Sequence, residues 1–292
     1  MDALNQLLAT FKVEAQIFHN GQYCGNWAID TSGSHYISFH IVTHGSCFLS
    51  LTQDQSHVEQ LNAGDIVLFP RDNSHCITSD ETISQPINVI DSSDYQHGVE
   101  HNSTGLVCGY FSHHHPMIKA ITQQLPDYIL IKKSDNQQSL LLLMQALMHE
   151  STTGNEGSAY VLNRIAEAIL AMIFRYHLPE EKGLVAAAIH PKLSVVLQAI
   201  HDAPQEKWTV EQLAALCHVS RASFADLFKE VLGQSPMEYL TQWRLSVAYR
   251  KLADDKVTTL EAALSVGYDN ESSFSKAFKR VLGLTPGAVR AS

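Results

Sequence analysis

The feature that most constrains this chain is a pattern of two helices and a tight turn that occurs twice near its C-terminal end. The first copy reads "VEQLAALCHVSRASFADLFKEVLG" and the second "TLEAALSVGYDNESSFSKAFKRVLG". In each copy two phenylalanines at helical spacing, Phe224 and Phe228 and then Phe274 and Phe278, give the second helix an apolar face. The start of that helix stays exposed, which is the layout of a helix-turn-helix that meets base edges. The sequence therefore predicts two helix-turn-helix units.

The segment between the copies, "PMEYLTQWRLSVAYRKLA", predicts one continuous helix. At about 1.5 Å per residue, roughly 17 residues make a spacer of about 25 Å. Such a spacer sets the units near one DNA turn apart, roughly 34 Å, so both second helices can enter successive major grooves. His218 stands at the turn of the first unit, where glycine is common. Because histidine tolerates left-handed backbone better than most residues, we expect that turn to form.

These stretches closely resemble the DNA-binding domain of AraC/XylS-type bacterial transcription regulators, from Trp208 to Arg290. The resemblance runs through "WTVEQLA", "FKEVLGQSPMEYL", "WRLSVAYRKL" and "ALSVGYDNESSFSKAFKRVLGLTP". It implies base-reading positions at Ala222, Ala225 and Asp226 in the first unit, and at Glu271, Ser272, Ser275 and Lys276 in the second. Ser223 shares the exposed start of the first of these helices. Phosphate contacts, which position a protein without reading sequence, are expected from Arg221, Lys229, Lys279 and Arg280.

Charge is divided unevenly along the chain. The formal net charge is -10, but from Val185 onward 12 Lys and Arg stand against 11 Asp and Glu, and the remainder has 8 against 19. The acidity therefore belongs to the first part, and the DNA-binding part is close to neutral. Because phosphate binding needs local cations, we expect weak non-specific DNA binding and read the balance as favouring a dimer or help from polymerase contacts.

The first part of the chain predicts short β-strands over about residues 15–111, broken by glycine, proline and polar loops. Many short strands of this kind predict a small barrel or sandwich. "GDIVLFPRDNSHCIT" resembles the second conserved motif of cupin barrels, through Gly64, Asp65, Pro70 and His75. About residues 15–131 resemble a regulator subgroup with cupin-like sensor domains. The predicted fold class is multidomain α+β, with an N-terminal cupin-like β-barrel with helices and a C-terminal all-α domain with two helix-turn-helix units.

The first cupin motif departs from the metal-binding pattern of a His-x-His pair and a glutamate. Ser38 takes the glutamate-like position and His35 stands alone, which leaves His40 and His75. Three interpretations stay open: histidines that shape or hydrogen-bond a pocket, a regulatory transition metal (zinc or similar) completed by cysteine or water, and catalysis. The two-histidine, one-carboxylate triad of iron oxygenases is not recognisable.

Five cysteines, with no CxxC pair, do not make a secreted disulfide framework, so we expect thiols. Cys24 and Cys108 each precede a glycine, in segments that are candidates for adjacent strands. One hypothesis is that a thiol here senses an oxidant, which requires a depressed pKa. The other is that these are small buried apolar residues.

The predicted domains are a cupin-like sensor domain at 1–135, a helical linker and dimerisation region at 136–184, and an AraC-type DNA-binding domain at 185–292. We expect a cytoplasmic regulator, since no secretory signal is seen and no apolar run reaches the roughly 18 residues that cross a membrane. The expected partners are promoter DNA, RNA polymerase, a small effector or oxidant, and a second copy of the chain, with no membrane. The alternative is a metal-dependent cupin enzyme fused to a DNA-binding module. The missing His-x-His and glutamate count against it.

Overall fold

The computed structural model describes residues 3, 5, 6, 13–51, 54–82, 103–112, 118, 122, 125–135, 138–176 and 182–291. The chain forms two compact units. The barrel unit is Val13–His113 with Leu125–His177, and the helical unit is Met1–Lys12, His114–Gln124 and Leu178–Ser292. A strand-rich first unit and an all-helical main body of the second confirm the predicted fold class.

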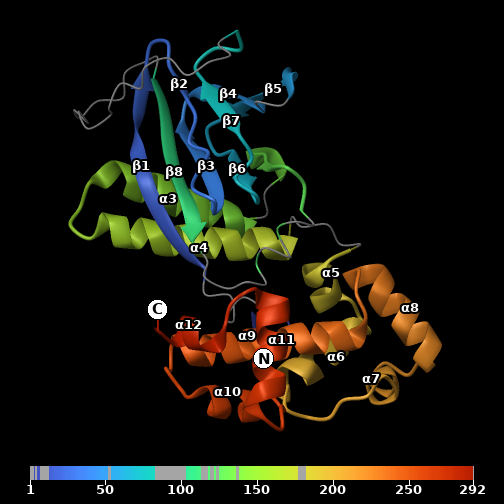
Figure 1. The fold of residues 1–292 in the computed structure, drawn as a ribbon. Helices are drawn as coiled ribbons and strands as arrows, with labels where there is room; N and C mark the ends of the chain where they lie inside the picture. Colours follow the sequence, from blue (N-terminus) through green and yellow to red (C-terminus); the bar gives the residue numbers. More distant parts are fainter. Residues whose placement is uncertain are drawn as a thin grey trace. The chain divides into compact units, whose positions relative to one another are not determined.

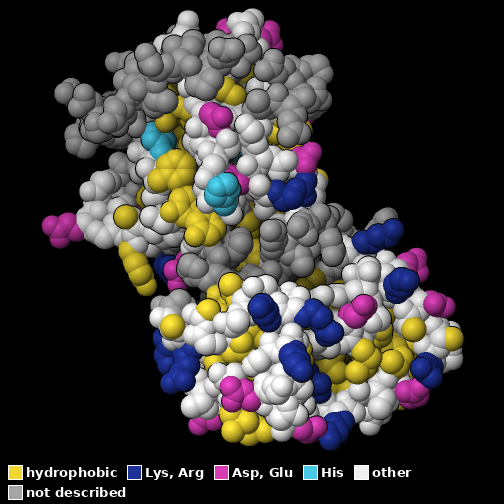
Figure 2. Space-filling model, in the orientation of Figure 1, with side chains coloured by type: hydrophobic (Ala, Val, Ile, Leu, Met, Phe, Trp, Pro, Cys, Tyr) yellow, Lys and Arg dark blue, Asp and Glu magenta, His cyan; other side chains and the backbone are white. Residues whose placement is uncertain are grey.

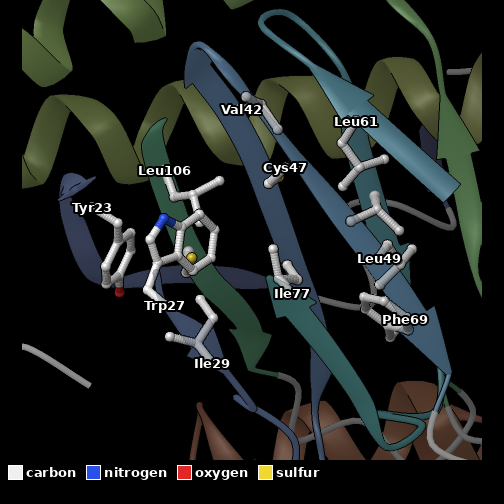
Figure 3. Close-up of a cluster of buried hydrophobic side chains, with 12 residues drawn as sticks. Tyr23, Trp27, Ile29, Val42, Cys47, Leu49, Leu61, Phe69, Ile77 and Leu106 are labelled. Carbon is white, nitrogen blue, oxygen red and sulfur yellow. The ribbon is translucent and has the colours of Figure 1, made fainter. Parts of the chain in front are cut away.

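The barrel unit is built from two antiparallel sheets (Figure 1). The five-stranded sheet has the order β1-β8-β3-β6-β9, and the four-stranded sheet β2-β7-β4-β5. The strands are β1 (Glu14–Cys24), β2 (Ala28–Ile29), β3 (Ile37–His44), β4 (Ser46–Leu51), β5 (Asp54–Asn62), β6 (Ile66–Phe69), β7 (His75–Thr78), β8 (Ser103–Ser112) and β9 (Ile129–Ile131), followed by the short helix η1 (Lys133–Asp135). Apolar side chains from both sheets, among them Val42, Leu49, Phe69, Ile77 and Leu106, meet between them (Figure 3).

Among the described residues of the barrel unit, the α-helices α3 (Gln138–Thr153) and α4 (Ser158–Tyr176) pack on each other. Helix α4 presents Ile169 and Ile173 to the sheet residues Phe39, Ile41 and Phe111. Since side chains alternate along a strand, β3 turns Phe39 and Ile41 toward α4 and His40 and Val42 toward the inside of the barrel. Burial of both faces explains why β3 is continuously buried from Ile37 to Val42.

The helical unit carries the predicted repeat. Over the described residues 182–291 its helices are α5 (Leu184–Ile189), α6 (Leu193–Asp202), α7 (Val210–Leu216), α8 (Arg221–Leu232), α9 (Pro236–Ala253), α10 (Thr259–Ser265), α11 (Glu271–Leu282) and α12 (Pro286–Ala291) (Figure 1). Helix α9 is the predicted spacer, 18 residues long. It begins with Pro236 at its first turn and a capping box in which Ser235 and Glu238 bond each other's backbone N–H groups.

A chain of hydrogen bonds runs through the core of the helical unit around His201. The imidazole stacks on Trp243, with 3.6 Å between ring centroids. Its Nδ1 lies 3.2 Å from Oε1 of Gln6, and its Nε2 lies 2.6 Å from the hydroxyl of Tyr239. Because the amide oxygen can only accept, Nδ1 carries the proton and Nε2 accepts from the tyrosine. Burial lowers the pKa of His201 to about 3.

We expect acid to destabilise the helical unit through His201. Below pH 6.5 the unfolded chain takes up a proton that the folded chain resists, so the free energy of unfolding falls by about 1.4 kcal/mol per pH unit until the folded pKa is reached. His201→Gln keeps a donor and an acceptor but cannot titrate. Urea unfolding of both proteins at pH 7.5, 5.5 and 4.5 should show a shallower pH dependence for the variant. Equal slopes would contradict the assignment, because the other buried histidines are common to both proteins.

Candidate functional site

The two helix-turn-helix units repeat each other down to their hydrogen bonds. Each first helix starts with a threonine capping box: Thr209 with Gln212 at α7, and Thr258 with Glu261 at α10. In each box the threonine hydroxyl accepts from a backbone N–H at the third helical position, and that residue's side chain accepts from the threonine N–H. The starts of both first helices are therefore fixed locally, by the sequence itself.

Each first helix ends in a left-handed residue, His218 with φ 54° and Gly267 with φ 84°. The next N–H donates back to the carbonyl at the last helical turn, from Val219 to Ala214 at 3.3 Å and from Tyr268 to Ala263 at 3.0 Å. This is the hydrogen-bonding pattern of a Schellman cap. The expected turn at His218 is confirmed.

The second helices, α8 and α11, are held from behind by four phenylalanines that are fully buried: Phe224, Phe228, Phe274 and Phe278. Ser220 and Asn270 cap their N-termini through side-chain oxygens. Gly233 and Gly283 end them in left-handed conformation, with φ 72° and 73°. Both helices have the same order of buried and exposed positions over their first ten residues.

All twelve residues expected at the DNA lie on these two helices. Ala225 and Ser275 are half-buried. The other ten are exposed: Arg221, Ala222, Ser223, Asp226, Lys229, Glu271, Ser272, Lys276, Lys279 and Arg280. The structure thus brings the predicted residues of each unit onto one accessible helix, and their contact with DNA stays a prediction.

On the face of the helical unit that Figure 2 shows, cations are dispersed rather than gathered in one patch. Figure 2 shows Lys and Arg side chains interspersed with Asp and Glu on the visible face of this unit. One of the expected phosphate contacts, Arg221, is already paired: its guanidinium lies 3.0 Å from the carboxylate of Glu211. Both side chains are more than half exposed, so the pair itself adds little stability.

Sequence reasoning missed the contacts that link the two helix-turn-helix units within the helical unit. These contacts run through the loop of residues 203–208, which precedes α7. Arg244 of α9 donates to the carbonyls of Pro204 and Glu206 at 2.5 and 2.7 Å. The turn at Gly267 lies so close to Gln205 that a Cβ there would stand 2.6 Å from its carbonyl oxygen. One signal was available: an arginine in the middle of an otherwise largely apolar stretch of the spacer helix.

In the barrel unit, His40 and His75 come together although they lie on different sheets. They are 1% and 0% exposed, and their Nε2 atoms are 2.8 Å apart. The hydroxyl of Thr31, which sequence reasoning did not select, lies 3.0 Å from one Nε2 and 3.2 Å from the other. Three polar groups therefore converge at one buried point. Burial lowers the pKa of His75. Burial also lowers the pKa of His40, and the nearby His75 and His19 lower it further. Both imidazoles are therefore neutral near pH 7.

The tautomer of His75 follows from its surroundings. Its Nδ1 lies 2.7 Å from the carbonyl oxygen of Asn73 and must donate to it, so its Nε2 presents a lone pair. The ring is fixed further by stacking on Phe69, with 3.7 Å between centroids. Since two lone pairs would repel, a proton is shared between the two Nε2 atoms or supplied by Thr31. The Nδ1 of His40 has no hydrogen-bond partner within the part of the chain that the structure describes.

His19 of β1 was also missed by sequence reasoning. It is paired across the strands with Cys108 of β8, which is paired in turn with His40 of β3. It is half-buried, and burial lowers its pKa. It belongs to no motif that the sequence analysis singled out, so only the strand register reveals its position beside the histidine pair.

The structure does not bring Cys24 and Cys108 together. Their strands are adjacent as expected, but Cys24 is opposite Ser103, whereas Cys108 is opposite His19. Cys108 is fully buried, and burial together with Cys47 raises the pKa of its thiol, which keeps it protonated. Cys24 is exposed, while Cys47, Cys76, Cys108 and Cys217 are buried.

We expect Cys24 to react with a thiol reagent at least tenfold faster than Cys108 in the folded protein, because Cys24 is exposed, whereas Cys108 is buried and the pKa of its thiol is raised. Maleimide labelling of the native chain, followed by peptide mapping, measures both rates. Labelling after denaturation in urea is the control and should make all five cysteines reactive. Equal native rates at the two positions would contradict the buried placement of Cys108.

Comparisons with known proteins agree with this architecture. The family described as cupin matches residues 2–179, and a helix-turn-helix domain matches residues 213–292. The "RCS-specific HTH-type transcriptional activator RclR" of Escherichia coli is 29% identical, over 99% of this chain and 97% of that protein. A "putative AraC-like transcription regulator" of Streptomyces lividans is also 29% identical, over 99% and 98%.

Among solved structures, the DNA-binding domain of AdpA in complex with a target DNA is 31% identical over 35% of this chain and 90% of that chain, with a TM-score of 0.33. Within the described residues no helix is both long enough and apolar enough to cross a membrane. Cupin and helix-turn-helix matches on one chain, and regulators similar to it over nearly their whole length, fix its class. The chain belongs to the cupin family and is an AraC-type DNA-binding transcription regulator rather than an enzyme.

Proposed function

We propose that this regulator reads promoter DNA with the exposed first turns of α8 and α11, and that its barrel binds a small effector at Thr31, His40 and His75. The observation that carries the second part is the convergence of three polar side chains inside an apolar barrel. Two imidazole nitrogens and a hydroxyl meet within 3.2 Å of one another. A small-molecule site has this composition: apolar walls with a few fixed polar groups.

The favoured effector is a small organic molecule or oxyanion that accepts and donates hydrogen bonds. The pair Nε2–H and Nε2 offers one donor and one acceptor, and Thr31 can serve as either. A ligand inserted here would replace the 2.8 Å contact between the imidazoles with bonds of its own. Because its binding free energy must differ between two states of the protein, the effector would act by favouring one of them.

A regulatory metal is the second candidate, favoured by the bond from His75 Nδ1 to a backbone carbonyl, which is how metal-binding histidines are often oriented. His40 and His75 would hold it through Nε2. Within the described residues, however, no group of three His, Cys, Asp or Glu is arranged to hold a metal ion. The described residues do not fit the complete ligand sets of zinc or iron cupin sites, so an ion would need ligands from water or from an effector.

An oxidant is the third candidate, and the E. coli relative is named as RCS-specific. If the barrel senses one, Cys24 is the residue that its exposure favours. A homodimer and contact with RNA polymerase also stay part of the proposal. The large apolar side chains that α3 and α4 expose, Leu142, Tyr160 and Val161, support pairing of two copies through these helices.

The test selects genomic DNA fragments with the purified full chain, alone and with Zn²⁺, hypochlorite or a metabolite mixture. We expect defined sequences to be enriched, and one addition to change their enrichment. If Zn²⁺ or the metabolite mixture causes the change, His40→Gln should abolish it, whereas His44→Gln, at the exposed end of the same strand, should keep it. A change caused by hypochlorite should instead be lost in Cys24→Ser. A response that survives His40→Gln would remove the proposed effector site, and no enriched sequence at all would contradict DNA reading.

A further inference from the structure

Helices α8 and α11 can be compared position by position. Both have 12 residues, an oxygen-bearing N-cap, two phenylalanines at the same places and a left-handed glycine after the last residue. Over their first ten positions the sequence of exposed, half-buried and buried residues is the same, whereas Val231 and Leu232 are buried and the corresponding Val281 and Leu282 are half-buried. Arg221 therefore corresponds to Glu271, and the correspondence continues to the glycines.

Three exposed positions reverse their charge between the helices. The pairs are Arg221 and Glu271, Asp226 and Lys276, and Glu230 and Arg280. Lys229 and Lys279 keep the same charge. Helix α8 thus carries two basic and two acidic residues, whose charges cancel, whereas α11 carries three basic residues and one acidic residue.

The basic residue in the first turn of α8, Arg221, forms an ion pair with Glu211 of α7 at 3.0 Å. The position that corresponds to Glu211 in the second unit is Leu260, an exposed apolar residue of α10. The two units therefore share a backbone frame but differ in charge, because the charges on α8 cancel and α11 carries an excess of positive charge.

We propose that the two helices read different classes of base, and this rests on the proposed contact with DNA. Asp226 can only accept, so in the major groove it suits the N4 amino group of cytosine and is repelled by the acceptor edge of guanine. Ala222 and Ala225 beside it suit thymine methyl groups. Lys276 can only donate, so the equivalent position of α11 suits O6 and N7 of guanine.

An operator read in this way has two unlike halves. The half under α8 presents cytosine and thymine to the helix, and the half under α11 presents guanine on the equivalent strand. One chain would then bind its site in one orientation only.

The test selects binding sites for the full chain from randomised duplexes and compares surface variants. Asp226→Asn changes an acceptor to an amide suited to adenine, so at one base pair of one half-site the preference should shift from cytosine to adenine, roughly tenfold or more. Lys276→Ala should weaken the preference for guanine in the other half by a similar factor and leave the first half unchanged. Asp255→Asn and Lys192→Ala, at exposed positions outside the two helices, are the controls and should alter neither. Unchanged thermal stability shows that each variant is folded.

Each outcome decides something different. Half-site preferences that change only with the corresponding residue support the assignment. A selected site with two like halves, or preferences that stay the same in both variants, would overturn it while leaving DNA reading intact. Failure of the wild-type chain to select any sequence would overturn the proposed function and this inference together.

Discussion

Replacing Gly267 by alanine should destabilise the helical unit by roughly 3 kcal/mol. Two costs add: a left-handed residue with a Cβ costs roughly 1–2 kcal/mol, and overpacking a close contact typically costs a further 1–3 kcal/mol. The contact is with backbone, the carbonyl oxygen of Gln205 at 2.6 Å from the added Cβ, which cannot rotate away. Differential scanning calorimetry should show a melting temperature lower by on the order of 10 °C.

Gly283→Ala is the matched control within the same helix-turn-helix unit. Its φ of 73° is close to the 84° of Gly267, but a Cβ there meets nothing within 4 Å. Only the conformational cost applies, so its melting temperature should fall by less than half as much. His218 shows that the equivalent turn of the first unit tolerates a side chain at φ 54°. If both glycine variants lose the same stability, the loop of residues 203–208 does not hold the second turn tightly.

The helix-turn-helix units could be predicted because their determinants are local. Phenylalanines four apart, a threonine before each first helix and a glycine after each second helix all act within a few residues of themselves. The structure confirms the fold class, the spacer helix and the turn at His218 on that basis. The ion pair between Arg221 and Glu211 spans the turn between α7 and α8. It was not predicted, although both residues lie in the first copy of the repeat.

The barrel site was only half predictable because its members meet through the packing of two sheets. His40 and His75 stood out against a family motif, but Thr31 lies outside any regular strand and acquires its role only from position. Adjacency of the strands of Cys24 and Cys108 was foreseen, yet the register places them apart. A shift of register along paired strands leaves the sequence pattern unchanged, so spacing could not decide whether two cysteines meet.

Removing two cations from α11 should weaken DNA binding more than removing two from α8. In Lys279→Ala with Arg280→Ala, both charges are expected at phosphates, and each contact contributes about 0.9 to the slope of log affinity against log salt. We expect that slope to fall by about 1.8 and the affinity at 0.15 M salt to drop by roughly tenfold or more. Fluorescence anisotropy with a selected duplex at several salt concentrations measures both quantities.

The matched variant is Arg221→Ala with Lys229→Ala, which removes the same net charge from the equivalent helix. Arg221 is already neutralised by Glu211 at 3.0 Å, so its contact with a phosphate releases fewer counterions from DNA. Removing it together with Lys229 should therefore lower the slope by only about 1 or less. Glu211 alone would then face the phosphates, so a third variant that also carries Glu211→Gln should recover part of the lost affinity. Equal slopes for the two double variants would mean that the ion pair opens on DNA at no cost. The electrostatic asymmetry between the units would then lie in the base-reading positions alone.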